Sequence, residues 1–287
     1  MTQTKMVCDA IDVATEGVHT EIVTITSEGD RDMRPLRDFA ERGVFAGALE
    51  QALRRGDIDL AVHSYKDLPL DAPSDLVICA VLEREDPRDA ICGMTATSLH
   101  TLPRGARIAT GSARRASILR TLRADLMPHD IRGNVASRLR TSAERGDDAC
   151  MLACAGLRRL GLSDSIVEAL DVADCVPDAA QGIVAIQARA DAIPGSIDWN
   201  AVSCADAAWA ATVERVVARE VGGGCDRPVG VHVAAPDASA TVWTCYVFRA
   251  TAAGEPGTTT TASVNRADEP VVAARNVLDL LPSLEAV

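Results

Sequence analysis

The apolar residues of the first 64 positions predict a helix, a strand, a second helix and a second strand. Residues 4–14 carry apolar side chains at helical spacing, and residues 44–56 repeat that pattern. Residues 20–26 and 58–64 are short apolar runs, which predict strands. Because strand, helix and strand follow one another, we expect a parallel sheet that is covered on both faces.

A second cycle of alternating patterns begins near residue 86. A strand pattern at 106–111 precedes a helix over 112–124, which Ser112 is placed to cap. The pattern next predicts the end of a strand at 130–134, a helix over 135–147, and a strand that runs into a helical turn over 148–162. Residues 178–191 are predicted to form a further strand that returns to the first sheet.

After residue 204 the predicted strands and helices are segregated. A helix over 204–221 precedes strand patterns at 229–236, 240–250 and 258–265, and a helix over 269–284 closes the chain. Segregation of this kind is typical of a small α+β domain. We therefore expect an α/β protein with three domains: residues 1–82 with 183–200, residues 88–176, and residues 205–287.

The composition narrows the possible ligands and the compartment. A formal net charge of −12 opposes general binding to nucleic acid or to an anionic membrane. The chain begins without a basic segment followed by an apolar run and has no stretch of 18 apolar residues, so we expect a cytoplasmic protein. Eight of the nine cysteines fit small buried residues of a reducing compartment, and Cys225, in a glycine-rich stretch, differs from them.

One region is cationic within this acidic chain. Residues 104–159 hold 12 arginines against five acids. Arg114 and Arg115 fall in the first turn of a predicted helix, and Arg132 ends a predicted strand, where open α/β sheets bind ligands. Arginine holds both oxygens of a carboxylate, so we expect a small anion with several carboxylates or phosphates. The other helix arginines are expected to be solvated: Arg120, Arg123, Arg140 and Arg145.

Lys66 and Asp67 follow the apolar strand of the first domain. Lysine occurs only twice in the 287 residues, at positions 5 and 66, so its presence here calls for an explanation. A carboxylate within a cationic cleft would stabilise a positive charge that develops on the bound substrate during a reaction. The same residues also fit an ordinary exit from a strand into a loop, and His63 fits a packed residue that makes one hydrogen bond.

Seven motifs, in this order and spacing, carry a resemblance to a known family. They are LAVHSYKDLP, VLEREDPRDA, ATGSARRASILR, DIRGNVASRLR, LACAGLRRLGL, QGIVAIQAR and GGGCDRPVG. From about residue 20 to about residue 235 the chain resembles the hydroxymethylbilane synthases, also called porphobilinogen deaminases. The resemblance implies two doubly wound domains like those of periplasmic binding proteins, a small α+β domain, and a monomer. It implies a transferase that joins four porphobilinogen molecules head to tail, with loss of ammonia, into a linear tetrapyrrole.

The resemblance also implies a role for particular residues. A dipyrromethane primer would be bound through a thioether to Cys225, and Asp67 would be the catalytic carboxylate that stabilises the cations formed during condensation. Lys66, Ser112, Arg114, Arg115 and Arg132 would hold the primer. The substrate and growing chain would contact a second set of residues: Thr110, Arg138, Arg159, Gln181 and Arg42.

The sequence departs from this family at its start. Members open with a strand, an arginine and a serine before the first helix, whereas this chain begins within that helix. We therefore expect that the start is misassigned and that upstream codons encode the missing strand. Two other interpretations remain: a two-domain solute-binding protein for a small polyanion, and an inactive, truncated paralogue.

Overall fold

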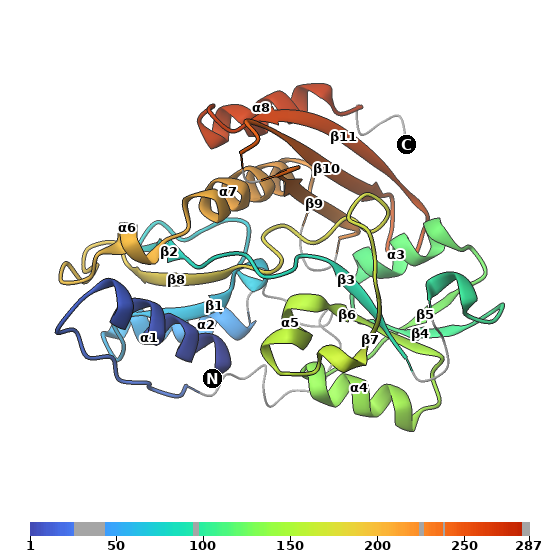
Figure 1. Ribbon diagram of the computed structural model, residues 1–287, viewed down its shortest axis with the longest axis horizontal. Helices are drawn as coiled ribbons and strands as arrows, with labels where there is room; N and C mark the ends of the chain where they lie inside the picture. Colours follow the sequence, from blue (N-terminus) through green and yellow to red (C-terminus); the bar gives the residue numbers. More distant parts are fainter. Residues whose placement is uncertain (26–43, 94–97, 224–226, 238, 283–287) are drawn as a thin grey trace. The chain divides into compact units, whose positions relative to one another are not determined.

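The computed structural model describes residues 1–25, 44–93, 98–223, 227–237 and 239–282 (Figure 1). The chain divides into two compact units. Unit 1 contains Met1–Glu85 and Ile183–Trp209, and unit 2 contains Asp86–Gly182 and Ala210–Val287. The expected division into three domains stays a prediction.

Unit 1 is built around a three-stranded sheet in the order β1-β8-β2. Strand β8 (Val184–Arg189) lies in the middle and pairs antiparallel with both β1 (Ala61–Ser64) and β2 (Leu76–Val81). Its side chains are buried from Val184 to Ala188. The expected return of residues 178–191 to the first sheet is confirmed, with the strand beginning at Val184.

The helices of unit 1 pack onto this sheet through their apolar stripes. Helix α1 (Thr2–Ala14) buries Val7 and Ile11 in one cluster with Val184 and Ile186 of β8. Helix α2 (Val44–Arg55) contributes Leu53 to a second cluster with β1 and β2. A short helix, α6 (Trp199–Val202), joins the first cluster. The two predicted helices of the first 56 residues are confirmed.

The predicted strand at residues 20–26 is wrong. Residues 21–25 have no strand structure, and residues 21–24 are exposed, whereas position 26 lies outside the described residues. A strand needs a neighbour to satisfy its backbone groups, and β1 pairs only with β8 among the described strands. The parallel sheet expected in unit 1 is therefore antiparallel at both described pairings.

Unit 2 contains a five-stranded mixed sheet in the order β5-β4-β6-β3-β7. Strands β5 and β6 both run parallel to β4, whereas β3 is antiparallel to β6 and to β7. The strands are β3 (Asp89–Cys92), β4 (Arg107–Ala109), β5 (Met127–His129), β6 (Ala149–Ala153) and β7 (Ile166–Ala169). The helices between them are α3 (Ala113–Leu122), α4 (Val135–Glu144) and α5 (Cys154–Arg159), as the sequence predicted.

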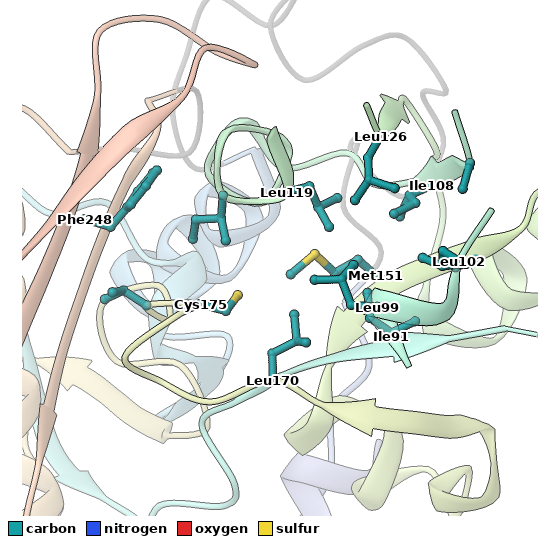
Figure 2. Packing of buried hydrophobic residues seen from close by; sticks show 14 residues of the cluster. Ile91, Leu99, Leu102, Ile108, Leu119, Leu126, Met151, Leu170, Cys175 and Phe248 are labelled. Carbon is teal, nitrogen blue, oxygen red and sulfur yellow. The ribbon is translucent and has the colours of Figure 1, made fainter. Parts of the chain in front are cut away.

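The C-terminal part of unit 2 packs on the same core. Strands β9 (Val229–Ala234), β10 (Val242–Ala250) and β11 (Gly257–Asn265) form an antiparallel sheet, and α8 (Pro270–Leu280) contacts β11. Figure 2 shows Phe248 of β10 at one side of a cluster that also contains Leu119 of α3, Met151 and Cys175. Helix α7 (Ala205–Glu220) leads into this part, and both its bounds lie within one residue of the prediction.

Candidate functional site

Three parallel strands of unit 2 end at one edge of the mixed sheet. Strand β4 is followed by Thr110 and the start of α3, β5 by Arg132, and β6 by α5 with Arg159 at its end. The carboxyl ends of adjacent parallel strands form the usual ligand-binding edge of an α/β sheet. The sequence therefore brings four predicted ligand residues to this edge of unit 2: Thr110, Ser112, Arg132 and Arg159.

The start of helix α3 is organised by two hydroxyl groups. Ser112 is the N-cap, and its Oγ accepts a hydrogen bond from the Arg115 backbone N–H at 3.4 Å. Thr110 Oγ1 accepts from the Ser112 backbone N–H at 3.3 Å, and Thr110 N–H donates to the His129 carbonyl at 2.8 Å. The predicted cap is confirmed, and the turn that precedes the helix is held against β5.

Arg114 and Arg115 are buried around one carboxylate, that of Asp89 at the start of β3. Arg114 Nη1 lies 2.7 Å from Asp89 Oδ2, and Arg115 Nη2 lies 2.7 Å from Oδ1. Asp89 is fully buried, and the two arginines are 3% and 5% exposed. The sequence suggested arginines at the rim of a cleft, whereas the structure holds both guanidinium groups inside unit 2.

The electrostatics of this cluster keep Asp89 and Arg114 charged. Burial by itself would raise the pKa of Asp89, but the Arg114 and Arg115 guanidiniums hold that pKa well below its usual range. Burial opposes the charge of Arg114, yet Asp89 and then Asp178 raise its pKa above the ordinary value. The result is one buried carboxylate shared by two guanidinium groups.

Two further side chains contact the Asp89 carboxylate. Gln181 Nε2 donates to Asp89 Oδ1 at 2.9 Å and to the Pro87 carbonyl at 2.7 Å. The Cys175 thiol donates to Oδ2 at 3.5 Å, and its pKa is raised well above normal, first by burial and then by Asp89. Gln181, expected to contact substrate, is fully buried in this cluster.

The other predicted arginines are less deeply buried. Arg138 of α4 is half-buried, and its Nε donates to the Gly133 carbonyl at 2.7 Å. Arg159 is half-buried, with Nη2 donating to the Gly182 carbonyl at 2.6 Å, and Arg132 is also half-buried. Of the arginines expected to be solvated, Arg123 is instead half-buried and donates to the carbonyls of Leu99 and Leu102.

In unit 1, Lys66 and Asp67 lie on a single 3-10 turn, η3 (Tyr65–Asp67), directly after β1. The Tyr65 N–H donates to the Ile183 carbonyl at 3.0 Å, and Leu68 after the turn is buried, so both ends of the turn are anchored. Asp67 is exposed and Lys66 is half-buried. His63 is buried with Nε2 at 3.1 Å from Gln187 Oε1, which confirms its predicted packing role.

Two predicted ligand residues, Arg42 and Cys225, lie outside the described residues. Over the part of the chain that is described, no cluster of three or more His, Cys, Asp or Glu side chains could hold a metal ion. A helix long and apolar enough to cross a membrane is likewise absent from the described ranges.

Sequence reasoning missed two buried acids. Asp89 opens an apolar strand within the motif VLEREDPRDA, and a charged residue beside Ala90 and Ile91 was the available signal. Glu214 lies on the apolar stripe of α7, between Ala210 and Val217, and is fully buried. Its Oε2 accepts from the Ala180 N–H and its Oε1 from the Val233 N–H, each at 2.7 Å.

These features define a class of protein: an α/β chain with arginines gathered at the carboxyl ends of its parallel strands. Residues 1–193 match the family model described as "Porphobilinogen deaminase, dipyromethane cofactor binding domain". The chain belongs to the porphobilinogen deaminase family.

Named relatives agree with the family model. A porphobilinogen deaminase of Roseiflexus sp. (strain RS-1) is 43% identical over 236 residues, which cover 80% of this chain and 76% of that protein. That of Micrococcus luteus is 40% identical over 270 residues, or 83% and 71% of the two chains. Among solved structures, a periplasmic substrate-binding protein from Coxiella burnetii has a TM-score of 0.44 at 15% identity, covering 72% of this chain and 89% of its own.

Proposed function

We propose that this chain is a hydroxymethylbilane synthase. The reaction is the stepwise head-to-tail condensation of four porphobilinogen molecules, with release of ammonia and then of the linear tetrapyrrole. The observation that carries the proposal is the set of guanidinium groups at and behind the carboxyl ends of β4, β5 and β6, in a chain of this family. Each pyrrole unit bears two carboxylates, so a growing chain needs several fixed cations.

The donor set of unit 2 fits a dipyrromethane primer. Arg114 uses Nη1 for Asp89 and Val176, and its buried Nε has no hydrogen-bond partner within the described part of the chain. A buried donor without a partner is costly, and a ligand carboxylate would satisfy it. Cys225 would carry the primer, whose pyrrole supplies the carbon nucleophile when bound.

The arginines bind and orient the acidic chain in this proposal. Arg114, Arg115 and Arg132 hold primer carboxylates with Lys66 and Ser112, and Arg138 and Arg159 hold those of incoming units with Thr110. Gln181 supports the same cluster through Asp89, and Arg42 adds a further cation. A bidentate guanidinium fixes both oxygens of a carboxylate, so it also fixes the ring that bears it.

Asp67 supplies the opposite charge. Loss of ammonia from porphobilinogen leaves a cation on the substrate, and a carboxylate held nearby stabilises that charge as it develops. A preorganised group of this kind contributes on the order of 3 kcal/mol to a barrier. The anchored turn η3 presents an exposed carboxylate, which suits a group that must meet an incoming substrate.

The mass of the purified protein tests the proposal. We expect a mass larger than that of the polypeptide by two pyrrole units, a colour with an aldehyde reagent for pyrroles, and consumption of porphobilinogen. Cys225→Ser should lose all three, whereas Cys204→Ser, a partly exposed cysteine elsewhere in the chain, should keep them. Unmodified protein that binds a small polycarboxylate without turnover would support the solute-binding interpretation instead. Unmodified protein without binding would support the inactive paralogue.

A further inference from the structure

The two oxygens of the Asp89 carboxylate accept hydrogen bonds from two different arginines, which are adjacent in the sequence. Oδ2 accepts from Arg114 Nη1 at 2.7 Å, and Oδ1 accepts from Arg115 Nη2 at 2.7 Å and Nε at 3.0 Å. A single anion therefore sets the position of two guanidinium groups that follow one another at the start of α3.

Backbone carbonyls complete the restraint on each arginine. Arg114 Nη1 also donates to the Val176 carbonyl at 2.7 Å, and Arg115 Nη1 donates to that of Met151 at 3.2 Å. A planar guanidinium that is held at two points can no longer rotate about its long side chain. The contacts on Arg114 use only Nη1, and its buried Nε keeps its hydrogen-bonding capacity within the described part of the chain.

Asp89 is itself fixed by the sheet. It is the first residue of β3, opposite Ala153 of β6, and its carbonyl accepts from the Leu170 N–H at 2.9 Å. Gln181 Nε2 adds a neutral donor to Oδ1 at 2.9 Å. The carboxylate therefore moves only if the central strands of the sheet move.

We propose that Asp89 is a positioning residue of the condensation reaction: it holds Arg114 and Arg115 in the one orientation that receives the carboxylates of the primer and the growing chain. The proposal rests on the proposed function. A purely structural role for Asp89 would explain little, because a buried ion pair stabilises a fold weakly, if at all, compared with apolar residues of the same volume. Its value here is the fixed geometry that it gives to two ligand-binding cations.

The chain offers a matched control for this carboxylate. Asp86 lies three residues earlier, is 7% exposed at its side chain, and also binds two arginines. Its Oδ2 lies 2.8 Å from both Arg88 Nη2 and Arg158 Nη2, and neither arginine has a proposed ligand. Asp86→Asn therefore removes a double ion pair of similar form without disturbing Arg114 or Arg115.

The experiment compares Asp89→Asn with Asp86→Asn in the full-length protein. Both variants are measured at a temperature where circular dichroism shows them folded, for primer content by mass, and for KM and kcat with porphobilinogen. We expect Asp89→Asn to carry less primer and to raise KM by about tenfold or more, since small misplacements of binding groups cost factors of this size. Asp86→Asn should melt at a lower temperature and keep wild-type primer content and KM.

Asp89→Glu keeps the experiment decisive if Asp89→Asn does not fold. It retains the negative charge but displaces it by one methylene group, so it should fold with a raised KM and reduced primer content. The proposal is overturned if the folded variants of Asp89 match Asp86→Asn in KM and primer content while the wild type is active. Wild-type protein with neither primer nor turnover would instead overturn the proposed function, and this inference with it.

Discussion

The two units hold their candidate charged groups in opposite ways. In unit 2, Arg114 and Arg115 are almost fully buried, and Asp89 neutralises part of their charge. In unit 1, Asp67 is exposed on a single turn. Each arrangement suits the charge that the group would meet. A permanent anion such as a carboxylate is best held by cations that cannot move, whereas a transient cation needs an anion that substrate can reach.

The comparison has an energetic side. The guanidinium groups of unit 2 are already desolvated and oriented. Binding of a ligand carboxylate therefore costs no further free energy for their reorganisation. Salt screens an exposed group such as Asp67 much more than a buried pair. Because Asp67 is proposed to stabilise a developing cation, substitutions near it in unit 1 should change the chemical step. The arginines of unit 2 are proposed to hold carboxylates, so substitutions there should change binding.

The largest effect is expected for Asp67→Asn. Loss of the negative charge should lower kcat by about 100-fold or more, corresponding to about 3 kcal/mol, while the arginine-dependent binding of the acidic chain remains. Single-turnover consumption of porphobilinogen measures the effect. Asp71→Asn, an exposed acid beyond the same turn, is the control and should react at the wild-type rate. Equal rates in the two variants would remove Asp67 from its proposed role.

His63 should make the stability of unit 1 depend on pH. Burial lowers the pKa of His63 from 6.5 to about 4, and its hydrogen bond to Gln187 opposes that shift only in part. The unfolded chain therefore binds a proton between these values while the folded chain does not, so stability is lost as the pH falls from about 6.5 to about 4. The loss should approach about 3 kcal/mol.

Urea unfolding at pH 7 and at pH 4.5 measures this loss. The wild type should show a lower free energy of unfolding at pH 4.5, and His63→Gln should lose less over the same interval because it carries no proton. An identical loss in both proteins would assign the acid sensitivity to carboxylates instead.

Periodicity predicted the helices well because each buries one stripe of side chains. Helices α1, α2, α3 and α4 all begin and end within three residues of the predicted bounds. The strands were predicted less completely than the helices. Strands β2, β3 and β7 were not predicted, because none of them shows the alternation of apolar and polar residues that marks a half-buried strand.

The candidate site shows the same limit of local reasoning. The Ser112 cap and the arginines beside it could be predicted, because a cap and a first turn are adjacent in sequence. Their burial could not, because the Asp89 carboxylate is 25 residues from Arg114 along the chain. The strand at residues 20–26 failed for a related reason: an apolar run becomes a strand only when a neighbouring strand accepts its hydrogen bonds.

Glu214→Gln should reduce the stability of unit 2 by about 2 kcal/mol. The Glu214 carboxylate accepts two backbone N–H groups, from Ala180 and Val233, and Ala180 has a positive φ of 62°. The amide of glutamine retains one acceptor and turns a donor towards the other N–H, which is then left buried without a partner. The midpoint of urea unfolding measures the change. Glu220→Gln, exposed at the end of the same helix, should shift it by less than about 0.5 kcal/mol. Equal midpoints in the two variants would contradict the prediction.

The smallest effect tests whether substrate binding in unit 2 depends on where each arginine lies or only on the total positive charge. Arg138 and Arg140 lie on the same helix, two residues apart and therefore on roughly opposite faces. Arg138 is half-buried, and its Nε donates to the Gly133 carbonyl. The Arg140 side chain is 71% exposed, and its Nε lies 3.6 Å from Glu144 Oε1. Arg138→Gln should raise KM for porphobilinogen by about tenfold, or about 1.4 kcal/mol, and Arg140→Gln should leave it unchanged.

Both arginine substitutions remove one positive charge from the same helix, so their difference isolates geometry from net charge. If KM rises equally in both, the chain binds its substrate through the general field of its 12 arginines between residues 104 and 159. In that case, raising the salt concentration should weaken binding to the same extent in both variants. If only Arg138→Gln responds, the guanidinium at the sheet edge contacts a carboxylate directly, and unit 2 recognises its ligand by the placement of single side chains.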